Sequence, residues 1–328
     1  MPGTRSQGSQ PRRTMIPMTA PEQVTPHYPD SFTVLEKCKY FTTCQVWPLK
    51  SRADPEAWLS NFRQDEMAHA TQLLNSVLLF QPPFMNGLFY SAFQSLSHRL
   101  VRGSDSFATA QARWRSFVDR VIITHVSGEN PSTTDSGFTF ARKAKKTLGI
   151  QESQILPPEE AIERVMALRA QPVVFVDDFV GSGNQFVVTW KRQHAIRTAN
   201  TVSFQNLAAM GFGEYFYVPL ICTDLGRGRI VRECPDVHIQ AAHVLDPRYS
   251  ALHPDSVIWP ELLRTTAPTF LREVSMRAGI PNDPTSVHHY QGFCSLGLTI
   301  AFEDSVPDAT VPLLSWNENG WKPLLRSN

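Results

Sequence analysis

The sequence predicts an α/β fold built around a parallel sheet, with a helical region before the sheet and an α+β extension after it. Two short apolar runs rich in β-branched residues, 121–126 and 173–176, have the composition of buried strands. Helical segments separate them from each other and from further strands predicted at 215–222 and 237–244. Strands that alternate with helices favour crossover connections, which place the strands side by side and parallel.

The chain length of 328 residues fits one large domain or two small ones, at roughly 150 residues per domain. Residues 1–31 contain six prolines and few apolar side chains, so they are predicted to form a disordered tail. We expect a helical region at 32–119, the α/β core at 120–258, and an extension at 259–328 packed on the core.

The helical region begins with a clear start signal. Asp54 precedes Pro55 and Glu56, which suits an N-cap followed by a proline in the first turn. Trp58 and Phe62 then share one helix face, and a helical stripe is predicted from Met67 to Leu78, ending at Gln81-Pro82-Pro83. Further helical segments are predicted at 88–100 and 107–118.

Between the core strands, helices are predicted at 138–148, 157–170 and 184–198. Gly226-Arg227-Gly228-Arg229 has the composition of a solvent-exposed turn, with phosphate contact as the alternative. In the extension, the pattern predicts a helix at 259–277 and a strand at 296–302.

Composition excludes several classes of function. The 31 basic and 30 acidic residues nearly cancel, which gives no support for direct nucleic-acid binding. No apolar run reaches about 18 residues, and the N-terminus lacks the apolar stretch of a secretory signal, so we expect a cytoplasmic protein without membrane spans. The five cysteines are odd in number and form no C-x-x-C pair, which predicts reduced thiols and no zinc site.

The main candidate ligand-binding residues lie within 173–185, which read V-V-F-V-D-D-F-V-G-S-G-N-Q. Asp177 and Asp178 follow a buried strand at its carboxyl end, where open α/β sheets bind ligands. Gly181 and Gly183 permit a tight turn whose amides, with the following helix N-terminus, attract a phosphate. Carboxylates beside that phosphate site suit hydroxyl groups or a divalent cation, so the unit predicts a sugar phosphate ligand.

This segment resembles the PRPP-binding signature of type I phosphoribosyltransferases. The resemblance implies a phosphoribosyltransferase-like core in which Asp177 and Asp178 hold the ribose hydroxyls, with Mg²⁺ accompanying the pyrophosphate of PRPP. It also implies a loop around the 5-phosphate, formed by Gly181, Ser182, Gly183, Asn184 and Gln185.

Three positions depart from the signature. Transferases often carry Asp, Ala or Thr where this chain has Gly181, and an acid there can contact the purine base. Asn184 and Gln185 are bulkier than the usual small pair. Phosphate binding tolerates these changes more easily than catalysis does.

A second loop, between the strand at 121–126 and the next helix, matches the family's pyrophosphate loop less closely. Its candidate residues are Ser127, Gly128, Glu129, Asp135, Ser136 and Gly137. Lys143, Lys145 and Lys146 would add positive charge, although a solvated helix face is the main expectation for them.

Over residues 55–325 the chain is similar to a divergent phosphoribosyltransferase-like group found in bacterial conflict and phage-defence cassettes, some beside reverse transcriptases, as in retrons. The similar stretches are 55–62, the segment from Asp177 to Gln185, and 311–324. The resemblance implies a role as a defence effector, with a protein partner from the same cassette.

Other candidate sites have weaker sequence support. A Walker B strand would need a G-x-x-x-x-G-K-S/T loop, which the chain lacks, and Phe179 rules out a D-x-D phosphatase motif. His125 and His194 are candidates for a general acid or base, although packed or exposed histidines are the expectation. His288-His289 is rejected as a metal pair because neighbours on a strand face opposite ways. Cys222 and Asp224 are weak candidates for a base-binding loop.

Three functions remain open. The first is an enzyme or effector that acts on PRPP or another ribose-phosphate ligand with Mg²⁺. The second is a non-catalytic nucleotide or sugar-phosphate sensor. The third is a partner-docking subunit that uses Trp316 and Trp321 as exposed anchors.

Overall fold

The computed structural model describes residues 29–127, 136–196, 201–284, 286, 288–302 and 305–326. A parallel sheet forms its centre, in the strand order β2, β3, β6, β7, with β8 also pairing with β6. This confirms the predicted α/β class. The strands are β2 (Ile122–His125), β3 (Pro172–Val180), β6 (Glu214–Thr223), β7 (Val237–Ile239) and β8 (His243–Leu245).

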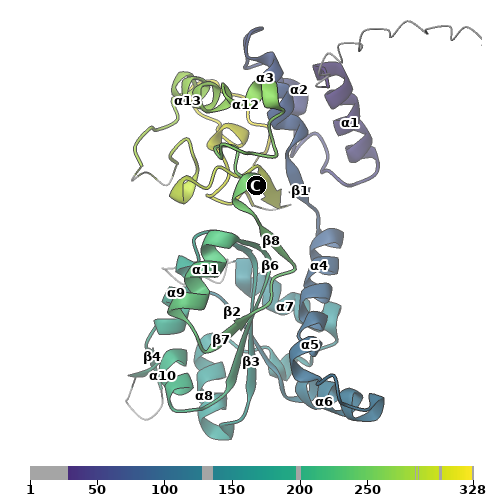
Figure 1. Ribbon diagram of the computed structural model, residues 1–328, viewed down its shortest axis with the longest axis vertical. Helices are drawn as coiled ribbons and strands as arrows, with labels where there is room; N and C mark the ends of the chain where they lie inside the picture. Colours follow the sequence, from purple (N-terminus) through teal and green to yellow (C-terminus); the bar gives the residue numbers. More distant parts are fainter. Residues whose placement is uncertain are drawn as a thin grey trace, which may run out of the picture.

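Helices cover both faces of the sheet (Figure 1). On β3, Val174 and Val176 pack with α4 and α7, whereas Val173 and Phe175 pack with α8, α9, α10 and α11. The alternation follows from the two-residue period of a strand. These helices are α4 (Pro82–Ser95), α7 (Ser136–Leu148), α8 (Pro158–Leu168), α9 (Asn184–Lys191), α10 (Phe204–Ala209) and α11 (Asp224–Glu233).

A second hydrophobic cluster joins segments from the two ends of the chain, and Figure 1 shows it as a body above the sheet. Trp58 is fully buried there, and its Nε1 donates to the Leu313 carbonyl at 2.8 Å. The cluster contains residues of α1 (Ser31–Thr43), α2 (Pro55–Leu59), α3 (Met67–Asn75), α12 (Glu261–Arg264), α13 (Ala267–Ala278) and the 3₁₀ helix η4 (Pro312–Leu314).

Two predictions about residues 78–83 were wrong. Leu78 lies in strand β1 (Leu78–Phe80), which pairs in parallel with β9 (Ile300–Phe302). Gln81 occupies the N-cap position of α4 without a side-chain capping bond, and Pro82 is the first helical residue, so this segment begins a helix. Proline suits that place because the first-turn amides have no partner within the helix.

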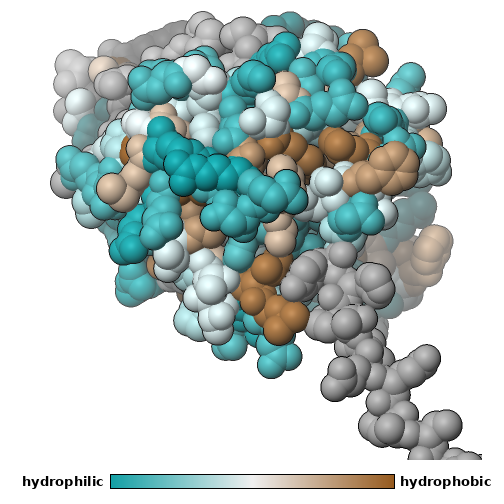
Figure 2. Space-filling model, turned by 90° about the horizontal axis from the view of Figure 1, so that it is seen from above, coloured by the Kyte–Doolittle hydropathy of each residue, from teal (hydrophilic) through white to brown (hydrophobic). Residues whose placement is uncertain are grey.

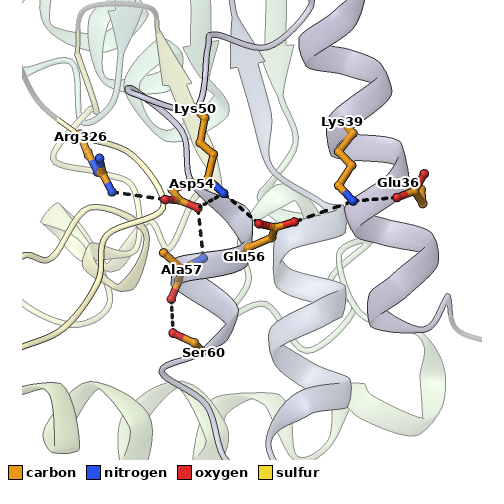
Figure 3. Close-up of polar contacts among 8 residues, drawn as sticks. All are labelled: Glu36, Lys39, Lys50, Asp54, Glu56, Ala57, Ser60 and Arg326. Carbon is orange, nitrogen blue, oxygen red and sulfur yellow. Dashed lines mark hydrogen bonds and ion pairs between the residues drawn. The ribbon is translucent and has the colours of Figure 1, made fainter.

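Asp54 caps α2 as predicted, and its Oδ1 accepts from the Ala57 amide at 3.1 Å. Its carboxylate also reaches Arg326 at 3.4 Å and Lys50 at 3.8 Å, and Lys50 continues to Glu56 at 2.8 Å (Figure 3). Because most of these side chains are solvent-exposed, the ion pairs add little stability. The network brings Arg326 beside the N-terminus of α2.

The predicted exposed tryptophan anchors are also wrong. Trp321 is buried, with Nε1 donating to the Leu313 carbonyl at 3.2 Å. Trp316 is half-buried, and its Nε1 donates to the Ala278 carbonyl at 2.9 Å. From above, the molecule shows small apolar groups separated by hydrophilic residues (Figure 2).

Some other boundaries differ from the prediction. Gly226–Arg229 lies within helix α11 and is not a turn, and the helix predicted at 184–198 ends at Lys191. No helix among the described residues is long and apolar enough to cross a bilayer. The remaining elements are α5 (Ser97–Leu100), α6 (Phe107–Arg120), β4 (His194–Ala195), β5 (Thr201–Val202) and the 3₁₀ helices η1 (Glu152–Gln154), η2 (Pro247–Tyr249) and η3 (Phe293–Ser295).

Candidate functional site

The two acidic residues lie inside strand β3 and not after it. The strand continues to Val180 and pairs with β6 as far as Cys222, so Asp177 and Asp178 are held by the sheet. Both are buried. The sheet therefore fixes their backbone more firmly than a loop would.

Asp177 has a defined set of partners. The Tyr217 hydroxyl donates to its Oδ2 at 2.9 Å, and the Asp178 amide donates to its Oδ1 at 3.0 Å. Burial raises the pKa of Asp177 well above its usual value, and the negative charge of Asp178 raises it further, against the opposing Tyr217 hydrogen bond. The ring of Tyr217 is in turn stacked on Phe186, with centroids 4.0 Å apart.

The glycine loop enters helix α9 through Gly183, which has a left-handed backbone with φ 76°. A Cβ at this position would lie 2.9 Å from the Gly226 carbonyl, so the turn requires glycine. Among the described residues, no acceptor bonds to the amides of Ser182 and Gly183. Unbonded amides at a helix N-terminus can accept an anion, which is compatible with the predicted phosphate loop.

Thr223 holds this loop from the neighbouring strand β6. Its hydroxyl donates to the Gly181 carbonyl at 2.5 Å and accepts from the Gly226 amide at 3.0 Å. A Cβ at Gly226 would lie 2.8 Å from Val180 and would also collide with the Gly181 carbonyl. The first turn of α11 therefore supports the Gly181–Gln185 loop, a role that sequence reasoning missed.

A cavity of about 310 Å³ brings the predicted residues together. Asp177 and Tyr217 line it, as does the whole loop from Gly181 to Gln185. Asp178 is not among the described residues that line it. Two further lining residues, Phe293 and Asp308, come from the C-terminal extension and were not predicted. Partial burial raises the pKa of the Asp308 carboxyl.

Of the second predicted loop, only part is described. The Ser127 amide donates to Thr189 Oγ1 at 3.2 Å, Thr189 Oγ1 donates to the Ser127 carbonyl at 2.8 Å, and Arg192 donates to the Ser127 hydroxyl at 2.6 Å. Ser136 and Gly137 begin α7. Gly128, Glu129 and Asp135 lie outside the described residues. These contacts join Ser127 to helix α9, which carries the phosphate loop at its other end.

The remaining candidates do not line this cavity. His194 packs against Phe204 and pairs through Nδ1 with Glu159 at 3.1 Å, as expected for a packed histidine. His125 is buried at the end of β2. Burial raises the pKa of Cys222 to about 12, so its thiol is protonated near neutral pH. Asp224 lines a separate cavity of about 420 Å³.

The predicted Mg²⁺ site involves the two acidic residues unequally. In the described part of the chain, no three His, Cys, Asp or Glu side chains gather as a metal cage. Mg²⁺ is often held by only one or two carboxylates together with substrate phosphates and water. Asp177 borders the cavity and could serve as such a carboxylate, whereas Asp178 is its neighbour on the same strand and does not line the cavity.

Comparison with known proteins places the chain in a family. No curated protein matches it. Among solved structures, it is similar to the AQ2163 protein from Aquifex aeolicus, with 11% sequence identity, a TM-score of 0.29 and coverage of 58% of this chain and 81% of that chain. The model of one family, PRTase-CE, matches residues 55–326, which run from α2 to the end of the described chain. The protein therefore belongs to the PRTase-CE family, a phosphoribosyltransferase-like family.

Proposed function

We propose that the cavity binds the ribose 5-phosphate part of PRPP or of a nucleotide. The observation that carries the proposal is that the Ser182 and Gly183 amides and the Asp177 carboxylate border one cavity. Amide donors suit the phosphate, and a carboxylate that borders the same cavity suits hydroxyl groups.

Each group has a separate task in this proposal. The loop amides and the N-terminus of α9 bind the 5-phosphate, with the Ser182 hydroxyl as a further donor. Asp177 accepts hydrogen bonds from the ribose hydroxyls, and Tyr217 fixes its orientation. Mg²⁺ bound by Asp177 and the substrate phosphates would neutralise the pyrophosphate of PRPP, since no Lys or Arg is among the described residues of the cavity wall.

A sensor without transferase activity is the second candidate. Gly181 supplies no side chain to an acceptor base, and neither His125 nor His194 lines the cavity to act as a general base. In either case, we further propose a role as a cytoplasmic defence effector that acts with a partner from the same cassette, on the resemblance of residues 55–62, 177–185 and 311–324 to such proteins.

Calorimetry with PRPP and Mg²⁺ tests the binding proposal. Replacing both Asp177→Asn and Asp178→Asn should abolish binding, whereas Asp246→Asn, an exposed aspartate outside this cavity, should leave it unchanged. An unchanged affinity in the double variant would contradict the proposal.

Turnover separates the two candidate functions. Pyrophosphate release from PRPP can be assayed across a panel of nucleobases, with the Asp177→Asn and Asp178→Asn double variant as the blank. Release with any base supports a transferase and refutes the sensor. Binding of PRPP with no release supports the sensor.

A further inference from the structure

The C-terminal extension occupies the space beside Gly181. A Cβ built on Gly181 would lie 3.4 Å from Leu296 and 3.7 Å from Ala309, both of the extension. It would also lie 3.2 Å from Phe179. The absent side chain at 181 thus leaves room for a second segment to reach the cavity wall.

Two parts of the extension are held together at this point. The Phe293 amide donates to the Asp308 carbonyl at 2.7 Å, and the Leu298 amide donates to the Ala309 carbonyl at 3.0 Å. A Cβ on Gly292 would lie 2.6 Å from the Ala309 carbonyl, so the loop packs directly on the backbone of Ala309.

The loop that presents Phe293 has an unusual backbone. Cys294 and Ser295 both have φ of 54°, a region that side chains other than glycine seldom adopt. Gly292 and Gly297, on either side, also have positive φ, at 72° and 57°. Strained conformations of this kind persist only where the surroundings enforce them, and they concentrate at binding sites.

Phe293 and Asp308 offer an aromatic ring and a carboxyl group to the cavity, although the backbone amides of Ala309 and Asp308 already donate to that carboxyl. Phe293 is half-buried and, within the described residues, contacts no other aromatic ring. In the same part of the chain, Asp308 forms no ion pair, although it lines the same wall. The aromatic face suits a planar ring, and the carboxylate accepts hydrogen bonds from N–H groups.

We propose that Phe293 and Asp308 bind the ring attached to the ligand's sugar, a nucleobase with an N–H group on its outer edge. Phe293 stacks on the ring, and Asp308 accepts from the N–H. The inference rests on the proposed function, because the sugar phosphate must first occupy the loop. Phe293 and Asp308 would then determine ligand specificity, whereas the Gly181–Gln185 loop recognises only the phosphate.

Calorimetry can separate the two levels of recognition. Ribose 5-phosphate and the four common nucleoside monophosphates are titrated into the full-length protein and its Phe293→Ala, Phe293→Tyr and Asp308→Ala variants. At least one nucleotide should bind more tightly than ribose 5-phosphate. Phe293→Ala should lower the affinity for that nucleotide roughly tenfold, the usual effect of losing one stacking contact. The affinity for ribose 5-phosphate should stay within about twofold of the wild-type value. Phe293→Tyr should preserve the stacking.

Asp308→Ala should lower the affinity for the same nucleotide but not the affinity for an analogue whose base lacks N–H groups. The inference is overturned if every nucleotide binds with the same affinity as ribose 5-phosphate. It is also overturned if Phe293→Ala or Asp308→Ala lowers the affinities for ribose 5-phosphate and nucleotide equally. If wild-type protein binds nucleotide but not ribose 5-phosphate, the proposed function itself fails.

Discussion

Replacing Thr223 with valine removes the hydroxyl that joins strand β6, the phosphate loop and helix α11. Valine keeps the branched shape, but the Gly181 carbonyl and the Gly226 amide lose their partner in a site where Thr223 is only 4% exposed. Loss of a helix cap costs about 1 kcal/mol, and an unpaired buried carbonyl costs roughly 1–3 kcal/mol. We expect the free energy of unfolding to fall by about 2–4 kcal/mol.

The loop should also lose its set position, so the affinity for ribose 5-phosphate should fall roughly tenfold, which corresponds to about 1.4 kcal/mol. Urea denaturation measures the first effect and calorimetry the second. Thr223→Ser retains both hydrogen bonds and should bind within about twofold of wild type. If Thr223→Val is folded and binds as tightly as wild type, Thr223 does not position the loop.

Three further predictions concern stability. Asp54→Ala should lower the free energy of unfolding by about 1 kcal/mol through loss of the α2 cap, measured by thermal denaturation, with the exposed Glu56→Ala as a control that changes little. Trp58→Ala should cost roughly 3–5 kcal/mol because it empties a fully buried site, and a loss below 1 kcal/mol would contradict that packing. The raised pKa of Asp177 means that the folded protein keeps a proton that an unfolded chain, with the ordinary value of 3.8, has released. Stability should therefore fall as pH rises above about 4, and Asp177→Asn should flatten that fall in urea titrations at several pH values; an unchanged slope would refute the assignment.

The parts of the fold that depend on local patterns were predictable. The strand at 173–176, the Asp54 cap and the helix after the glycine loop each follow from residues close together in sequence. The amides of Ser182 and Gly183 could be placed at a helix N-terminus for the same reason. Phosphate binding by this loop stays a prediction.

The remainder depends on contacts between distant residues. Leu78 continues a helical pattern, but pairing with Ile300 draws it into a strand. Gly226 looks like a turn residue, yet it lies in a helix. Its lack of a side chain allows the Gly181 carbonyl to approach closely. Phe293 and Asp308 reach the cavity from the extension, and no local pattern marks them as site residues.

The most direct test of the central claim is an amide nuclear magnetic resonance titration with ribose 5-phosphate and, separately, with ribose. We predict that ribose 5-phosphate produces its largest shifts at the Ser182 and Gly183 amides, and that ribose leaves those amides unmoved. Shifts elsewhere, with Ser182 and Gly183 unchanged at saturation, would contradict a phosphate site at the start of α9.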